Sequence, residues 1–117
     1  MMIKISIVEV DKSVILFLAI DMSSSDVVGK CAFKVRKNNS IRYQDAFIEK
    51  INRGKGIYKQ LFNTREKYVQ ENYPNFIIES YCNKSTLHYF KSNGFSIKTK
   101  LYLVEKNNHI SQNLKVV

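Results

Sequence analysis

The sequence is poor in the residues that interrupt or cross-link a chain. Its 117 residues include one Pro, four Gly, two Cys and no Trp. With so few breakers, no segment has the composition of a linker, and the sequence holds no internal repeat. The length suits one domain and is too short for two. We therefore expect a single domain over residues 1–117.

The two cysteines, Cys31 and Cys82, stand far apart, and neither belongs to a CxxC motif. No His stands at metal-ligand spacing from them. We therefore expect neither a structural zinc site nor a metal cofactor. Both cysteines lie in apolar stretches, which predicts two reduced, buried thiols.

Long hydrophobic runs are absent as well. The most apolar run, residues 13–20, is too short to span a bilayer as a helix. The first ten residues, MMIKISIVEV, lack the apolar core and the cleavage site of a signal peptide. We expect a cytoplasmic protein with no membrane partner.

Acidic residues are few beside basic ones: nineteen Lys and Arg face ten Asp and Glu, for a net charge of +9. This balance favours polyanionic partners, and it keeps RNA among the candidates. Lys, Asn and Ile are all abundant, as in proteins from AT-rich genomes, so many lysines can simply solvate the surface. A hydrophobic fraction of 44% argues against global disorder.

The first half of the chain has strand periodicity. Residues 3–10 alternate between polar and apolar, whereas residues 14–20 form a continuous apolar run that predicts a strand buried on both faces. Hairpin-length connections separate the segments at residues 11–13 and 37–40. We expect four strands in an antiparallel meander, at residues 3–10, 14–20, 27–36 and 41–50.

The second half mixes helical and strand patterns. Apolar residues at helical spacing predict an amphipathic helix over residues 54–71, which Pro74 ends. A short strand at 76–81 follows, and then a short helix that begins at Asn83 and ends at Gly94. Residues 96–106 alternate as a last strand. The tail, residues 107–117, fits either a further strand or a frayed end.

The predicted order is therefore strand, strand, strand, strand, helix, strand, helix, strand. This order describes a mixed α/β (α+β) domain with a mainly antiparallel sheet and two helices. The strand-helix-strand unit at its centre predicts that the fourth and fifth strands run parallel. A ligand position is expected near the turn from the fourth strand into the first helix.

That turn is Arg53-Gly54-Lys55-Gly56. The first turn of a helix has backbone N–H groups without intrahelical partners, and glycine lets a phosphate approach them. The stretch has neither the spacing of a Walker loop nor that of a dinucleotide-binding fingerprint. On these grounds alone, a phosphate cradle and an ordinary turn both remain open.

A second motif narrows the choice, because the two together resemble the GNAT acetyltransferase superfamily. The pyrophosphate loop of that family, Gln/Arg-x-x-Gly-x-Gly/Ala, is similar to residues 53–58. Its later signature is an Asn, a short helix, an aromatic pair and Gly-Phe, similar to Asn83, Thr86, Tyr89-Phe90 and Gly94-Phe95. The strand order matches too, and the resemblance covers residues 27–104.

The resemblance implies an N-acetyltransferase that uses acetyl-CoA and needs no metal, with direct attack by an amine in a ternary complex. The diphosphate would rest on backbone N–H groups of the glycine turn. The pantetheine arm would follow the edge of the fourth strand, splayed from the fifth at a bulge. The implied cofactor-binding residues are Phe47, Ile48, Arg53, Gly54, Lys55, Gly56, Ile57, Tyr58, Lys59 and Asn83.

Two aromatic residues depart from the family pattern. Tyr58 replaces the last Gly/Ala of the loop, where its ring would crowd a phosphate or cover the nucleotide. Phe90 stands where many members carry the tyrosine that protonates the leaving thiolate, and the tyrosine here is Tyr89. The side chains of two consecutive residues on a helix point about 100° apart around its axis. Tyr89 is our candidate acid, and we expect Phe90 in the core.

A third departure concerns the acceptor side. The family usually has one or two helices between its first two strands, whereas only residues 11–13 stand there in this chain. The more open site suits a large acceptor such as a protein lysine. An amine must lose a proton before it attacks. The candidate bases are Asp45 first and Glu49 second, followed by Glu79 and His88.

Two other functions stay open. A GNAT-like module could bind CoA or a protein and catalyse nothing, which Tyr58 and Phe90 favour. A small basic domain could instead bind nucleic acid, with the glycine turn on backbone phosphates. For the enzyme, the acceptor classes are a protein lysine, an N-terminus, a small amine and an aminoacyl-RNA.

Overall fold

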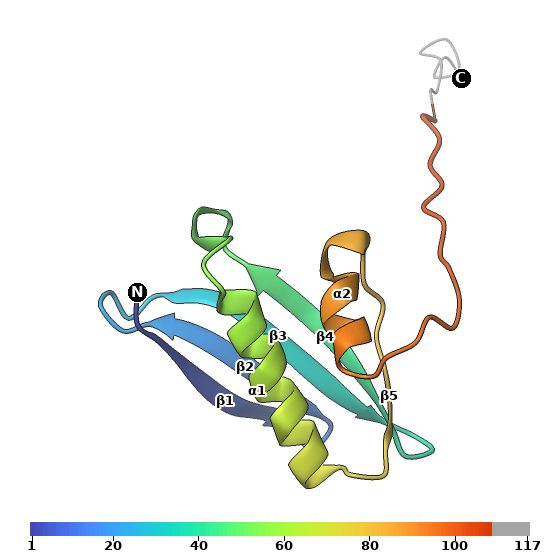
Figure 1. Cartoon of the computed structure of the whole chain (residues 1–117), viewed down its shortest axis with the longest axis horizontal. Helices are drawn as coiled ribbons and strands as arrows, with labels where there is room; N and C mark the ends of the chain where they lie inside the picture. Colours follow the sequence, from blue (N-terminus) through green and yellow to red (C-terminus); the bar gives the residue numbers. More distant parts are fainter. Residues whose placement is uncertain (109–117) are drawn as a thin grey trace, which may run out of the picture.

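The computed structural model describes residues 1–108, except the side chain of Asp45. In this part of the chain, one five-stranded sheet has the order β1-β2-β3-β4-β5 (Figure 1). Its elements are β1 (Ile3–Asp11), β2 (Val14–Asp21), β3 (Val27–Arg36), β4 (Ser40–Ile48), the 3₁₀ helix η1 (Lys50–Asn52), α1 (Ile57–Asn72), β5 (Ile77–Glu79) and α2 (Lys84–Ser92). The expected mixed α+β class is confirmed.

The first four strands form the predicted antiparallel meander. β1 and β2 are joined directly, and the carboxylate of Asp11 accepts hydrogen bonds from the backbone N–H groups of Ser13 (2.7 Å) and Val14 (3.1 Å). In the β3–β4 turn, Asn38 and Asn39 adopt positive φ, which asparagine tolerates better than most residues. The sequence therefore builds both hairpins from local turn chemistry.

β4 and β5 run parallel, as predicted, with α1 between them in the chain. Their pairing is short: only Ser40 to Arg42 of β4 face Ile77 to Glu79 of β5. β4 continues to Ile48 beyond this ladder, whereas β5 ends at Glu79.

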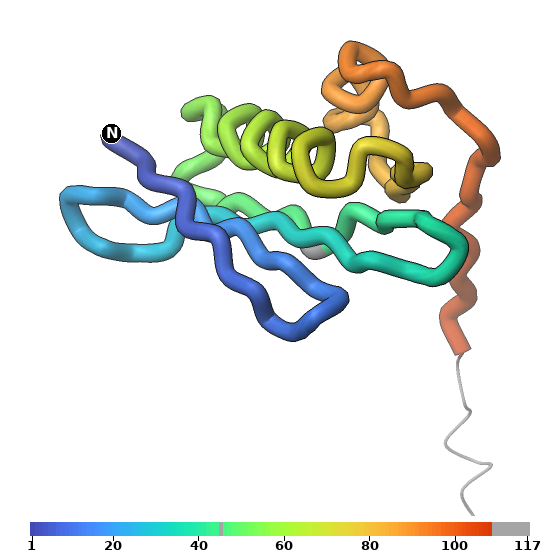
Figure 2. Tube along the Cα trace, turned by 90° about the horizontal axis from the view of Figure 1, so that it is seen from below, coloured from blue at the N-terminus to red at the C-terminus, as the bar shows by residue number. Residues whose placement is uncertain are grey.

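Both α-helices cover the same face of the sheet (Figure 2). Phe17 and Phe33, fully buried on this face, lie with their ring centroids 5.6 Å and 5.8 Å from that of Tyr68 on α1. The buried apolar side chains form one core between sheet and helices: Ile15, Phe17, Ala19, Val28, Cys31, Phe33, Ile41, Tyr43, Ile48, Ile57, Leu61, Phe62, Val69 and Phe90.

A glycine lets α1 approach the sheet closely. A Cβ at Gly29 of β3 would lie 2.7 Å from Cδ1 of Ile48 and 3.3 Å from side-chain atoms of Ile57 and Leu61. Atoms of that kind do not come so close, so a larger residue would push α1 away from β3. Gly29 thus holds the start of α1 beside the end of β4.

The prediction that residues 14–20 are buried on both faces was half right. Ile15, Phe17 and Ala19 are buried beneath the helices, whereas Leu16 and Leu18 on the other face are only half-buried. Among the described residues no helix stands between β1 and β2 to cover that second face. An apolar run predicts a strand but not how many layers cover it.

The predicted last strand at residues 96–106 is not formed. Residues 95–108 have no regular secondary structure, and Figure 1 shows an extended segment that leaves the body of the domain. Leu101, Tyr102 and Leu103 are exposed there. A strand needs the hydrogen bonds of a neighbouring strand, and no described residue pairs with this segment. Residues 109–117, part of the ambiguous tail, lie outside the described residues.

Three further outcomes concern the start of α1, the two cysteines and the length of the helices. α1 begins at Ile57, after two glycines at positive φ, rather than at Gly54. Cys31 is buried as predicted, but Cys82 is exposed because the chain leaves the sheet after Glu79. Within residues 1–108, no helix is long and apolar enough to cross a membrane.

Candidate functional site

A β-bulge in β4 shapes the site. Gln44 faces Ala32 of β3 and Phe47 faces Lys30, so two residues of β4 stand opposite the single Cys31. A bulge of this kind bends its strand and leaves one residue outside the ladder. It lies just beyond the three residues of β4 that pair with β5, so the edge of β4 is unpaired from there on among the described residues.

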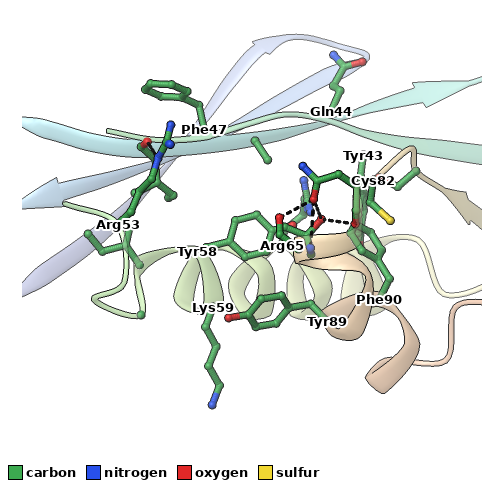
Figure 3. Close-up of a pocket in the computed structure, with 18 of the residues that line it drawn as sticks. Tyr43, Gln44, Phe47, Arg53, Tyr58, Lys59, Arg65, Cys82, Tyr89 and Phe90 are labelled. Carbon is green, nitrogen blue, oxygen red and sulfur yellow. Dashed lines mark hydrogen bonds between the residues drawn. The ribbon is translucent and has the colours of Figure 1, made fainter. Parts of the chain in front are cut away.

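A cleft of about 730 Å³ lies where β4 and β5 part (Figure 3). This volume is in the usual range for small-molecule sites. The lining comes from β4, the glycine turn, the first helical turns of α1, the segment after β5, and α2. The lining residues are Tyr43, Gln44, Ala46, Phe47, Ile48, Asn52, Arg53, Gly54, Gly56, Ile57, Tyr58, Lys59, Arg65, Ser80, Tyr81, Cys82, Asn83, Ser85, Thr86, Tyr89 and Phe90.

The two glycines of the turn are required by backbone conformation. Gly54 and Gly56 have φ of +79° and +80°, and an added Cβ would meet no atom within 4 Å at either position. The first helical hydrogen bond of α1 runs from the Gln60 N–H to the Gly56 carbonyl at 3.1 Å. The N–H groups of residues 57–59 therefore have no intrahelical acceptor, and the space beside them is open. Such a helix start binds anions.

The charge of the cleft fits an anion. Arg53, Lys59 and Arg65 line it, and no described lining residue carries a carboxylate. The Nε–H of Arg53 donates to the Ile48 carbonyl at 3.0 Å, which fixes the guanidinium beside β4. Lys55 is not a lining residue; its Nζ donates to Asn52 Oδ1 at 3.3 Å. The described residues contain no group of three or more His, Cys, Asp or Glu side chains that could hold a metal ion.

Asn83 lines the cleft as the N-cap of α2, as the sequence predicts. Its Oδ1 accepts hydrogen bonds from Ser85 Oγ at 2.6 Å and from the Thr86 N–H at 3.2 Å. Because the cap occupies the amide oxygen, the NH₂ group is the part of this side chain that can donate to a ligand.

Three aromatic residues join α1 to α2 on the far side of the cleft. The rings of Tyr58 and Tyr89 lie with centroids 5.1 Å apart, and both side chains are half-buried in the lining. Burial raises the pKa of the Tyr58 hydroxyl. Phe90 is 5% exposed and packs edge-on against Phe62 at 5.0 Å, which confirms its expected place in the core.

Of the four predicted bases, Glu49, Glu79 and His88 do not line the cleft. Glu49 follows β4, is exposed and is not a lining residue. Glu79 is bound in ion pairs with Arg36 and Arg42, and His88 is exposed outside the lining. Asp45 is part of β4, between two lining residues, but its side chain lies outside the described residues.

A buried polar cluster beside the cleft was missed from sequence. Arg65 is 1% exposed, its Nη1 donates to the Ala32 carbonyl at 3.1 Å, and its Cζ lies 3.8 Å from the ring centroid of Tyr43. The Tyr43 hydroxyl donates to the buried Glu66 carboxylate, and burial together with this bond raises the pKa of Tyr43. The signal was present: Arg65 stands on the apolar stripe of the helix, four residues after Leu61.

Comparisons with known proteins agree on the fold. No protein-family model matches the chain, and no curated protein matches it. Solved structures do match. A putative acetyltransferase from Exiguobacterium sp. 255-15 aligns with a TM-score of 0.67 at 13% identity, over 86% of this chain and 89% of that one. A GNAT-family acetyltransferase from Staphylococcus aureus Mu50 aligns with a TM-score of 0.57 at 22% identity, over 69% of this chain and 51% of that one.

The chain has the GNAT fold. A third match is a putative streptothricin acetyltransferase from Bacillus anthracis str. Ames in complex with acetyl coenzyme A, with a TM-score of 0.61 at 21% identity, over 77% of this chain and 52% of that one. This is a short form of the GNAT fold, because β1 leads directly into β2. These three structural neighbours are described as acetyltransferases, and at 13–22% identity the likeness concerns the fold.

Proposed function

We propose that this protein is an acetyl-CoA-dependent N-acetyltransferase that moves an acetyl group to an amine by direct attack in a ternary complex. The observation that carries the proposal is the cleft between β4 and β5, which ends at a helix start with free N–H groups and open space. The GNAT fold of the chain supports the same reading.

The lining residues fit two parts of acetyl-CoA, the diphosphate and the pantetheine arm. The N–H groups at residues 54–59 and the cations Arg53 and Lys59 suit the diphosphate, and Lys55 lies at the same turn. The unpaired edge of β4 near Phe47 and Ile48 suits the amide groups of the pantetheine arm. Asn83 lines the cleft, and its NH₂ group is a further donor for a ligand.

Acetyl-CoA would supply an activated thioester, and the chain would supply proton transfer and polarisation. The bulge in β4 leaves backbone groups outside the ladder, and we expect one of these N–H groups to donate to the thioester carbonyl. Asp45 is the first candidate base because its neighbours in β4 line the cleft, and Glu49 is the second. Tyr89 is the candidate acid for the departing thiolate.

The decisive experiment is calorimetric titration with acetyl-CoA of the wild type and two variants, Gly56→Asp and Gly56→Asn. Both side chains tolerate the φ of +80° at this position better than others do, and they differ by one charge. The left-handed backbone at position 56 strains both variants alike, so Gly56→Asn is the control for that strain.

We expect micromolar binding by the wild type and binding at least about tenfold weaker for Gly56→Asp than for Gly56→Asn, because the added carboxylate repels the diphosphate. Equal affinity of the two variants would mean that the glycines only turn the chain. No binding by the folded wild type would refute the proposed function.

Tyr89→Phe tests the acid. We expect the rate of CoA release with a lysine-containing peptide to fall by about tenfold or more, with little change in acetyl-CoA affinity. Tyr68→Phe is the matched control, because Tyr68 packs against Phe17 in the core and does not line the cleft. An unchanged rate for Tyr89→Phe would assign this side chain to packing.

A second candidate function is a module that binds CoA without catalysis. The observation that favours it is the burial of Phe90, since the resemblance expects a hydroxyl at that place. The same calorimetry and release assay separate the two: tight binding with no acetyl transfer to any tested amine would select the module.

A further inference from the structure

The face of the sheet that carries no helix among the described residues is basic along β3 and β4. Residues that face each other in antiparallel strands point to the same side of the sheet, and Cys31 and Phe33 point to the helices. Their neighbours along β3 therefore point the other way. The basic face consists of Lys30, Lys34 and Arg36 of β3 and Arg42 of β4.

This arrangement is electrostatically unfavourable for the free protein. Lys34 stands directly opposite Arg42, and like charges in that position destabilise a sheet. Glu79 meets the basic face with Oε1 2.6 Å from Arg42 Nη2 and 3.4 Å from Arg36 Nη1. Asp11 lies close enough to Lys34 for that charge to help lower its pKa, after the hydrogen bonds of its own turn. Two carboxylates against four cations still leave an excess of positive charge. A hollow of about 510 Å³ lies among Lys34, Arg36, Arg42 and Glu79.

Two exposed aromatic rings stand beside these cations. Phe47 faces Lys30 and is therefore on the same side of the sheet, where it is 53% exposed; Figure 3 shows it on the side of β4 away from α1. Tyr81 is 60% exposed, and the Arg42 guanidinium lies over its ring at 5.1 Å. The sequence separates these rings from the cations, and the sheet brings them together.

We propose that the basic face, with Phe47 and Tyr81, binds single-stranded RNA. Cations in a row along strands suit successive phosphates, and exposed rings stack on unpaired bases. An acidic peptide would use the cations but would leave both rings without a function, and a duplex would offer no free bases to stack. The four cations do not line the cleft, whereas Phe47 and Tyr81 do, so this site adjoins the cleft at its β4 edge. It does not depend on acetyl transfer.

The test is fluorescence anisotropy with a labelled single-stranded RNA of mixed sequence, about 12 nucleotides long. Titrations at several salt concentrations should give a log Kd that rises with log salt, with a slope of roughly 2 to 3 if most of the four cations contact phosphates. Binding without salt dependence, or no binding at low salt, would overturn the proposal.

Charge-matched variants locate the site. The double variant Lys30→Glu/Lys34→Glu should weaken RNA binding by at least about tenfold and lower the salt slope. The control Lys67→Glu/Lys91→Glu makes the same change of net charge on exposed positions of the helices and should have an effect below about twofold. Lys34→Glu sets an acid opposite Arg42, so the fold should be kept. Equal losses in both double variants would reduce the effect to net charge and overturn the assignment.

Stacking is tested at Tyr81. Tyr81→Leu should weaken binding by about tenfold, whereas Tyr81→Phe should keep it, because only the ring is required. Equal affinity of Tyr81→Leu would refute stacking at this ring. Competition by polyglutamate as strong as by RNA would point to an acidic protein instead, and equal affinity for DNA of the same sequence would refute the RNA assignment.

The outcome is separate from that of the proposed function. Acetyl-CoA calorimetry on the same preparations shows whether the cleft is intact in each variant. If the wild type binds acetyl-CoA but not RNA, this inference alone is refuted. If it binds RNA but not acetyl-CoA, the proposed function alone is refuted.

Discussion

The two faces of the sheet are built from the same strands and differ in almost everything else. Beneath the helices, Phe17 and Phe33 are completely buried. On the other side, Leu16 and Leu18 of β2 are half-buried, and β3 presents Lys30 and Lys34. Because side chains alternate along a strand, neighbouring residues of one segment serve opposite purposes.

This difference separates stability from recognition. The covered face holds α1 against β3 and so positions the helix start at the cleft. The helix-free face presents the exposed side chains of Lys30 and Lys34 on β3, which can meet a partner. Substitutions on the two faces should therefore act on different properties, from the free energy of unfolding to the binding of charged ligands.

The largest effect is expected from Phe33→Ala on the covered face. Phe33 is 0% exposed, so its truncation should lower the free energy of unfolding by about 3–5 kcal/mol in urea denaturation. Leu18→Ala on the helix-free face is the matched comparison and should cost about 1–2 kcal/mol, because a half-buried side chain loses less apolar contact. Equal losses would mean that another layer covers the second face in solution.

A smaller effect is expected from alkaline pH at Cys31. Burial raises the pKa of its thiol from 9.0 to about 11, so the folded state keeps a proton that the unfolded state loses in this interval. Stability should therefore be unaffected below pH 9.0 and fall as the pH rises toward about 11, by roughly 2–3 kcal/mol from this thiol.

The measurement is the urea midpoint as a function of pH for the wild type and Cys31→Ala, which should lose this part of the slope. Cys82→Ala, at an exposed thiol, is the control and should leave the slope unchanged. A wild-type slope that survives in Cys31→Ala would assign the alkaline loss to another group, with the buried Tyr43 as the next candidate.

The smallest effect is expected from Lys34→Glu on the helix-free face. The change replaces a like-charge pair with an opposite-charge pair beside Arg42, so stability should rise by about 0.2–1 kcal/mol at low salt. Thermal unfolding at low and high salt measures it, and the gain should shrink as salt screens the pair. A loss of stability would show that Lys34 makes a favourable contact, for example with Asp11, whose pKa is lowered mainly by its hydrogen bonds to Ser13 and also by the Lys34 charge.

Local patterns were sufficient for most of the fold. Alternation at residues 3–10 and an apolar run at residues 14–20 predicted the first two strands of the meander, and the stripe of Ile57, Leu61 and Val69 predicted α1. Asn83 and Gly94 correctly bounded α2, because a cap and a positive-φ residue are requirements of the helix ends themselves. The failure at residues 96–106 has the opposite cause, since alternation cannot provide the neighbouring strand that a ladder needs.

The residues predicted for the site also fall into those that line the cleft and those that do not. Gly54, Gly56, Asn83 and Tyr89 were named from motifs and all line the cleft, because each lies at a turn or helix end with a local signature. Lys55 was named from the same loop motif and Glu49 as an acid of the predicted fourth strand, and neither lines the cleft. Their direction depends on how the chain leaves β4, which no residue pattern expresses.

The sequence by itself determined the order of elements, the two glycines at positive φ and the excess of positive charge, because these follow from single residues and their near neighbours. Only the tertiary structure decided that β4 and β5 part after three paired residues, that Arg65 is buried on Tyr43, and that one face of the sheet lies free of helices in the described residues. Each of these depends on contacts between residues far apart in the chain. Such contacts exist only once the strands have paired and the helices have packed on the sheet.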